Sequence, residues 1–308
     1  MNRANHPILC LLALLLMAAC NTESSKAPVR SAYYWSTTFA LDSMQREWMS
    51  KEGVRRMYVR YFDVVESIDG TVMPNATINF QDSVPEGVEV VPCVFVTNEA
   101  MAHAPAHLDS LIYQRVKQMS ATHDIKRVKT IQIDCDWSQR TRTAYFAMLE
   151  GIRNRAHADG LQLSVTIRLH QLSQSVPPAD AGVLMVYNTG DVRNMERDPI
   201  LSAEDVRPYL RHLSGYDLPL SAAYPAFAWD IQYRRGQYIE IRHIDDEMRL
   251  MPGDTLVHRA PSVETVLQVK HIIDAERSDV HGEIILFDIS KNNIQRITKH
   301  HYEKVYTD

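Results

Sequence analysis

Two carboxylates that stand two residues apart, Asp134 and Asp136, close an apolar run at residues 131–137. Side chains alternate between the two faces of a strand, so these carboxylates point the same way. A pair of like charges at the end of a buried strand costs solvation free energy, and proteins mostly keep one at a sugar, metal or proton-transfer site. We therefore expect the functional site at the end of this strand. In the structural alternative, the acids form ion pairs with arginines such as Arg140 and Arg168.

Strands and helices that would position these acids alternate along the chain. Eight apolar, β-rich runs are predicted strands, at residues 32–36, 56–62, 88–97, 130–136, 162–168, 182–187, 218–224 and 283–288. Amphipathic helices are expected at residues 41–51, 108–122, 140–159, 203–213 and 262–277, with short or unclear connections after the second and fifth strands. Eight such units predict an α/β fold, a closed (β/α)8 barrel of the TIM type. An open doubly wound sheet is the alternative, but no Gly-rich phosphate loop follows the first strand.

One long connection, residues 225–261, separates the seventh strand from its helix and has the length of a lid or small subdomain. A hairpin is predicted within it, from residues 237–241 and 247–250 and a turn at residues 252–254. Such an insertion lies at the C-terminal face of a barrel, where active sites are found.

The carboxyl ends of all barrel strands meet at one mouth, so the polar and aromatic residues there form one candidate site. Aromatic rings stack on the C–H faces of sugars, while carboxylates and amides bind their hydroxyls. Asp134 and Asp136 are the predicted catalytic residues. The predicted substrate-binding residues are Trp35, Trp137, Arg168, Met185, Tyr187, Asn188, Tyr224 and Asp288. The sequence indicates no metal site and no cofactor.

The end of the fourth predicted strand resembles that of glycoside hydrolase family 18, whose signature there is D-G-x-D-x-D-x-E. Asp134, Asp136 and Trp137 match its last two aspartates and a commonly following tryptophan. Met185 and Tyr187 on the sixth strand are similar to the M-x-Y of that family. The resemblance implies a barrel that acts on carbohydrate.

The chain departs from this signature at three positions. Ile131, Gln132 and Ser138 replace the first aspartate, the glycine and the terminal glutamate. In family 18 that glutamate protonates the glycosidic oxygen, while the preceding aspartate orients the acetamido group that attacks the anomeric carbon. A serine cannot protonate a leaving group at neutral pH, and losing a general acid lowers the rate by roughly 10²- to 10⁴-fold. An unmodified family 18 reaction is therefore not expected.

A second resemblance, carried by residues 132–136 on a lipoprotein barrel, is to an uncharacterised bacterial family, domain of unknown function 3142, which implies no activity. Two hypotheses follow. In the first, a glycosidase-like enzyme uses Asp134 and Asp136 with a third acid from Asp63, Glu99 or Asp288; a divalent cation bound by the two aspartates is a minor variant. In the second, a non-catalytic barrel holds a glycan without a proton donor.

The amino-terminal residues predict the compartment. A basic residue, an apolar run at residues 8–18 and small residues before Cys20 resemble a bacterial lipoprotein signal. Residues 1–19 are therefore expected to be cleaved, Cys20 to carry the lipid, residues 20–30 to be a flexible tether and residues 31–308 to be one barrel domain. This predicts a protein attached to a membrane in the bacterial cell envelope. The formal net charge of −5 argues against a nucleic-acid partner, and Cys93 and Cys135 are expected to be buried free thiols.

Overall fold

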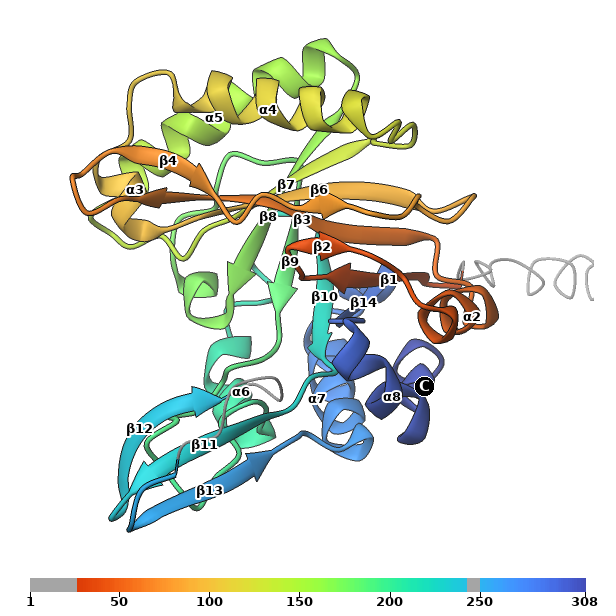
Figure 1. Cartoon of the computed structure of the whole chain (residues 1–308), viewed down its shortest axis with the longest axis vertical. Coiled ribbons are helices and arrows are strands. Elements are labelled where there is room, and N and C mark those ends of the chain that lie inside the picture. The colour runs from red at the N-terminus through yellow and green to blue at the C-terminus, as the bar shows by residue number, and fades with distance from the viewer. Residues whose placement is uncertain (1–26, 243–249) are drawn as a thin grey trace, which may run out of the picture.

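The computed structural model describes residues 27–242 and 250–308, and its centre is a closed barrel of parallel strands (Figure 1). Pairing of β1 with both β3 and β14 closes the barrel. Each predicted strand overlaps one of the observed strands, so the predicted fold is confirmed. In order around the barrel these are β1 (Val29–Tyr34), β3 (Arg56–Glu66), β6 (Glu89–Val96), β7 (Thr130–Asp134), β8 (Gln162–Arg168), β9 (Ala181–Met185), β10 (Leu220–Pro225) and β14 (Glu283–Phe287).

Helices cover the outside of the barrel. The predicted helices overlap α2 (Ser43–Lys51), α4 (Leu108–Thr122), α5 (Arg142–Ala158), α6 (Ala203–Leu210) and α7 (Val263–Glu276). The structure adds α3 (Asn98–Ala102), α8 (Lys291–Lys299) and the 3-10 helices η1 (Leu169–Ser173), η2 (Ser278–Gly282) and η3 (Tyr302–Tyr306). The connections predicted to be irregular are so: β3 is followed by the antiparallel β4 (Val72–Asn75), and β8 by η1 alone. The short strands β2 (Thr38–Phe39) and β5 (Asn79–Phe80) pair beside the barrel.

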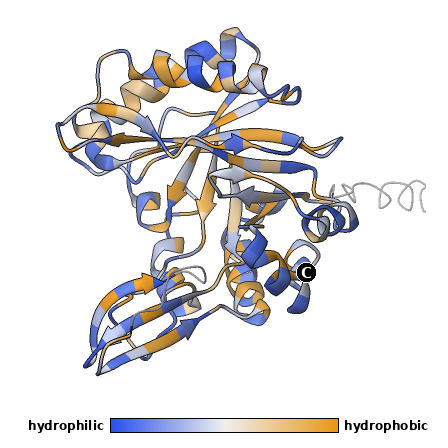
Figure 2. Cartoon of the chain, in the orientation of Figure 1, coloured by the Kyte–Doolittle hydropathy of each residue, from blue (hydrophilic) through white to orange (hydrophobic). Residues whose placement is uncertain are grey.

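Alternation along the strands creates two buried layers. The outward-facing residues pack against the helices in the larger core, and the inner layer fills the barrel. Figure 2 shows hydrophobic residues along the barrel strands and mixed colouring on the outer helices. The inner layer consists of Tyr33, Tyr58, Val91, Cys93, Val183, Met185, Ala223 and Ile285. Trp35, Tyr187 and Phe287 pack on top of it and form the floor of the mouth.

A buried carboxylate closes the opposite end of the barrel. Glu283 pairs with Arg56 at 2.8 Å and accepts hydrogen bonds from the hydroxyls of Tyr58 and Ser221. These bonds satisfy the charge that burial would otherwise penalise. Cys93 and Cys135 are buried free thiols, as predicted.

The insertion between β10 and α7 is a three-stranded antiparallel sheet of order β12-β11-β13, which extends away from the barrel (Figure 1). Its strands are β11 (Trp229–Arg234), β12 (Gln237–Arg242) and β13 (Asp254–Arg259). The first predicted hairpin strand coincides with β12, but β12 pairs with the unpredicted β11. Residues 247–249 of the second predicted strand lie outside the described residues. So do the predicted signal segment, Cys20 and residues 20–26 of the tether. In the described part of the chain no helix is long and apolar enough to cross a membrane.

Candidate functional site

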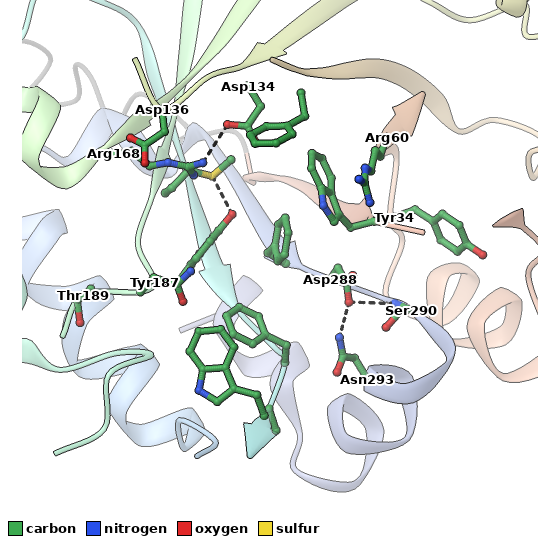
Figure 3. Close-up of a pocket in the computed structure, with 18 of the residues that line it drawn as sticks. Tyr34, Arg60, Asp134, Asp136, Arg168, Tyr187, Thr189, Asp288, Ser290 and Asn293 are labelled. Atoms are coloured by element: carbon green, nitrogen blue, oxygen red, sulfur yellow. Dashed lines mark hydrogen bonds and ion pairs between the residues drawn. The ribbon is translucent and has the colours of Figure 1, made fainter. Parts of the chain in front are cut away.

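A cavity of about 1190 Å³ opens at the C-terminal ends of the barrel strands (Figure 3). Its walls come from the ends of barrel strands, from the start of the insertion, and from α6 and α8. Ligand pockets for small molecules usually measure about 300–1,000 Å³, so this cavity is large enough for a ligand of several rings.

Three polar side chains from β7 and the residues after it, two residues apart, point into the barrel. They follow one another toward its C-terminal mouth. Gln132 is fully buried and accepts a hydrogen bond from the Tyr33 hydroxyl at 2.7 Å. The side chain of Asp134 is 7% exposed, and that of Asp136 is 60% exposed. Asp134 and Asp136 both line the cavity, but they differ strongly in access to solvent.

Asp134 is held by two donors from β8. Its carboxylate accepts a hydrogen bond from Thr166 Oγ1 at 2.6 Å and one from Arg168 at 3.1 Å. Burial opposes the charge on Arg168, but the neighbouring groups together outweigh it, Asp134 most of all, and the pKa of Arg168 is raised. The structural alternative is therefore right for Asp134 and Arg168. No ion pair links Arg140 to either acid within residues 27–242 and 250–308.

Asp136 has much weaker contacts. The nearest ionisable partner that the structure gives it is His170, whose Nε2 lies 3.9 Å from Oδ1 of Asp136. That distance is longer than a hydrogen bond. His170 follows β8 in η1 and also lines the cavity. Asp136 is thus the carboxylate of this pair that a ligand can reach.

The end of β9 places Met185, Tyr187 and Asn188 in the lining of the same cavity. Burial raises the pKa of Tyr187, so its hydroxyl stays protonated and can donate a hydrogen bond. That hydroxyl lies 3.3 Å from Met185 Sδ. Asn188 adopts a left-handed conformation with φ of 55°, and its exposed side-chain amide forms no hydrogen bond with the described part of the chain. The amide of Asn188 is therefore available to a ligand.

A buried acid, Asp288, lies across the cavity from Asp136 (Figure 3). Trp35 lines the cavity and its ring packs against that of Phe287 at 5.7 Å. Asp288 accepts hydrogen bonds from the backbone N–H of Ser290 at 3.3 Å and from the side chain of Asn293. Burial raises the pKa of Asp288 above its ordinary value.

Of the three candidates for a third acid, Asp288 is the one that lines the cavity. Asp63 forms an ion pair with Arg60, and neither Asp63 nor Glu99 lines the cavity. Within the described residues no group of three or more His, Cys, Asp or Glu side chains is arranged to hold a metal ion.

Two predicted binding residues do not line the cavity, because their side chains point to the outer side of the barrel. Trp137 is 2% exposed and packs against Tyr145 and Phe146 of α5. Tyr224 is fully buried, and its hydroxyl lies 2.7 Å from His281 on the outer side of the barrel. Both side chains support the packing of helices, and their assignment to substrate binding is corrected.

Ser138 also lies outside the cavity lining. Its backbone N–H donates to Thr141 Oγ1 at 3.0 Å and to Asn98 Oδ1 at 3.3 Å, in the turn that begins α5. The chain has already left the strand direction there, so the alternation of β7 does not extend to this residue. Asp136 is therefore the last side chain of this segment that lines the cavity.

Several lining residues were not assigned from the sequence. Tyr209 comes from α6, Phe227 and Trp229 from the start of the insertion, and Asn293 from α8. His170, Phe227 and Trp229 had a usable signal, since each closely follows a predicted strand. Tyr209 and Asn293 depend on how α6 and α8 pack over the mouth.

Several solved structures share the barrel fold of this chain. A chitinase from Chromobacterium violaceum superposes with a TM-score of 0.57 at 13% identity, over 89% of this chain and 99% of that one. The fold is shared with chitinases. A chitinase from Bacteroides thetaiotaomicron gives 0.58 at 11% identity, over 92% and 98% of the two chains. The spore cortex-lytic enzyme SleL of Bacillus cereus gives 0.57 at 13%, over 91% of this chain and 73% of that enzyme. No protein-family model matches the sequence, and no curated protein matches it.

Proposed function

We propose that this chain is a glycosidase-like hydrolase that takes a glycan into the mouth of the barrel, with Asp136 as the acid that acts on the glycosidic bond. The observation that carries the proposal is the exposed carboxylate of Asp136 in a cavity floored by aromatic rings. A fold alone does not assign a function. The chitinase-like neighbours support the proposal only through their shared architecture.

The proposed chemistry divides the work between the two aspartates. Hydrolysis needs a proton on the leaving oxygen as the bond to the anomeric carbon breaks and water adds to that carbon. Asp136 is placed to reach the leaving oxygen, because its side chain is exposed and has no hydrogen-bonded partner at short distance. Its carboxyl gives that oxygen a proton and regains one from the water that adds to the anomeric carbon. Asp134, neutralised by Arg168, holds the site in place, and the Tyr187 hydroxyl and Asn188 amide bind sugar hydroxyls.

A non-catalytic glycan-binding barrel is the second candidate. One observation favours it: Asp134 is occupied by Thr166 and Arg168, which leaves Asp136 as the accessible acid of the pair. Binding needs the aromatic floor and the free amide of Asn188 but no proton transfer.

A turnover assay on chromogenic N-acetylated and plain glycosides distinguishes the two. If the enzyme proposal is right, Asp136→Asn lowers kcat by roughly 10²- to 10⁴-fold. Ser138→Ala is the matched control and leaves turnover unchanged, because Ser138 lies outside the cavity. Ser138→Glu is not expected to add activity, for the same reason. Wild-type turnover that survives Asp136→Asn would move the chemistry elsewhere, whereas calorimetric binding without turnover would establish the second candidate.

The cellular setting is a separate part of the proposal. We propose that Cys20 carries a lipid that anchors the protein in the bacterial cell envelope, as a lipoprotein similar to the uncharacterised family 3142. The support is the order of apolar run, small residues, cysteine and polar tether in the sequence. Mass spectrometry of the membrane fraction tests this: the expected chain begins at a lipid-modified Cys20, and an unmodified chain beginning well after it contradicts the proposal.

A further inference from the structure

The chain enters the barrel at the end opposite the mouth. The barrel strands run parallel, so their amino ends form one edge of the barrel and their carboxyl ends form the mouth. Ala27, the first described residue, lies two positions before β1, which begins near α2 on the right of Figure 1. Ala27 and the start of β1 line an open hollow of about 380 Å³ together with Lys51 and Arg55. A tether that ends at Ala27 therefore reaches the molecule at the closed end of the barrel.

Basic residues follow this edge from β1, past β3 and β6, to β7. The backbone N–H of Arg55 donates to the carbonyl of Arg30 at 2.9 Å, and the N–H of Glu89 donates to the carbonyl of Arg55 at 2.9 Å. The N–H of Val90 donates to the carbonyl of Arg127 at 3.0 Å. These hydrogen bonds place the three arginines in one row along the amino ends of neighbouring strands.

Two lysines beside this row extend into solvent. The side chain of Lys51, the last residue of α2, is 74% exposed, and that of Lys129, directly before β7, is 76% exposed. Lys51 lies 3.6 Å from a carboxylate oxygen of Glu52, and Lys129 lies 3.4 Å from one of Glu89. The basic edge is the set of Arg30, Lys51, Arg55, Arg127 and Lys129.

The acids of this region are less accessible than its lysines. The side chain of Glu52 is 9% exposed and that of Glu89 is 13% exposed. Glu86 and Asp124 are exposed in the segments that lead into β6 and β7, and Asp124 pairs with Lys126 at 3.2 Å. The positive side chains therefore stand further into solvent than the two acids beneath them, which leaves an excess of positive charge at the surface of this edge.

The position of Cys20 in the sequence brings this edge close to a membrane if that residue carries a lipid. Cys20 precedes Ala27 by seven positions. An extended chain covers at most about 3.6 Å per residue, so the two residues lie within about 25 Å of each other. Anionic phospholipids attract clusters of Lys and Arg that come within a Debye length, about 8–10 Å, of the bilayer surface. The tether is thus short enough to hold the basic edge at the headgroups.

We propose that the basic edge binds anionic phospholipid headgroups, so that the barrel stands with its closed end on the membrane and its mouth facing away. The proposal rests on the lipid anchor proposed above for the nearness of the membrane, and on the charges of the edge for the choice of lipid. A glycan then reaches Asp136 from the aqueous side and not from the lipid surface.

The test measures how fast individual lysines react with an amine-labelling reagent, read by peptide mass spectrometry. The chain purified from membranes is added to preformed vesicles of phosphatidylcholine, alone or mixed with phosphatidylglycerol in equal parts. Lys51 and Lys129 should react more slowly on the anionic vesicles, by roughly 5-fold, and added salt should remove the difference. Lys291 is the internal control, because it is exposed at the mouth and should react equally on both.

Charge reversal tests which residues make the contact. Arg55→Glu combined with Arg127→Glu should abolish the protection of Lys51 and Lys129. The matched control combines Arg207→Glu with Arg211→Glu, which changes the net charge equally. Both control residues are exposed, at the end of α6 and directly after it, and α6 follows β9 on the other side of the barrel. This control should keep the protection.

The outcomes separate the basic edge from the anchor. Protection of Lys51 and Lys129 but not of Lys291 on anionic vesicles, lost only in the variant of the edge, supports the proposal. Equal rates on both kinds of vesicle, or equal protection of Lys291, overturn it. The same mass spectra identify Cys20: an unmodified Cys20 overturns the anchor, and sedimentation with the anionic vesicles then decides the basic edge alone, since binding supports it and a chain left in solution overturns it.

Discussion

Separating Asp134 from Arg168 should destabilise the protein far more than separating a surface ion pair. The two side chains are 7% and 24% exposed, and their charged atoms lie 3.1 Å apart. Removing one partner of a buried pair typically costs 3–5 kcal/mol, because a buried charge is left uncompensated. Asp134 keeps the hydrogen bond from Thr166, so we expect the low end of this range, about 3 kcal/mol, for Arg168→Met.

A double-mutant cycle with Asp134→Asn measures the interaction itself. Because the asparagine leaves no charge to compensate, the double variant should lose less free energy of unfolding than the two single variants lose together, by about 2 kcal/mol. Urea unfolding followed by circular dichroism and by fluorescence gives the four free energies of unfolding. The control is Arg153→Met, which breaks a pair with Asp180 in which Arg153 is 39% exposed, and should cost about 0–1 kcal/mol. Additive single effects at Asp134 and Arg168 would refute the view that this pair is buried and coupled.

Two further predictions concern stability. Burial raises the pKa of Asp288, so the folded state binds a proton more tightly than the unfolded state does, and stability is lost as pH rises above the ordinary pKa of 3.8. Asp288→Asn should flatten this loss of stability in melting curves recorded between pH 4 and 7. An unchanged pH dependence of the melting temperature would contradict the raised pKa of Asp288. At Gly182 an added Cβ would lie 2.9 Å from side-chain atoms of Leu218 and Leu220; Gly182→Ala should therefore lower the free energy of unfolding by about 1–3 kcal/mol, measured by urea titration, and a fully stable variant would show that these leucines move aside.

The barrel could be predicted because its strands are continuous apolar runs with helical patterns between them. Helix α8 was missed since its nine residues are mostly polar, with Ile294 and Ile297 as its buried positions. The end of β10 is predicted to within one residue, but the insertion is predicted as a hairpin because β11 follows β10 after only a few residues and is not marked in the sequence as a separate strand.

The candidate site was predictable where a side chain's direction follows from strand alternation. Asp134, Asp136, Met185 and Tyr187 reach the cavity by this rule. The same rule turns Trp137 outward, because its spacing from the two aspartates is odd. Its assignment to substrate binding rests instead on the resemblance to the family 18 signature. Tyr209 had no sequence signal, since a helix face can be aimed at the mouth only by tertiary packing.

The most direct test of the proposed function is a crystal structure of the protein with a soaked N-acetylglucosamine tetrasaccharide. We expect electron density for the glycan in the cavity, with one sugar stacked near Trp35 and a glycosidic oxygen within hydrogen-bonding distance of Asp136. A glycan bound only elsewhere on the molecule, with the mouth empty although the ligand saturates the protein in solution, would contradict it.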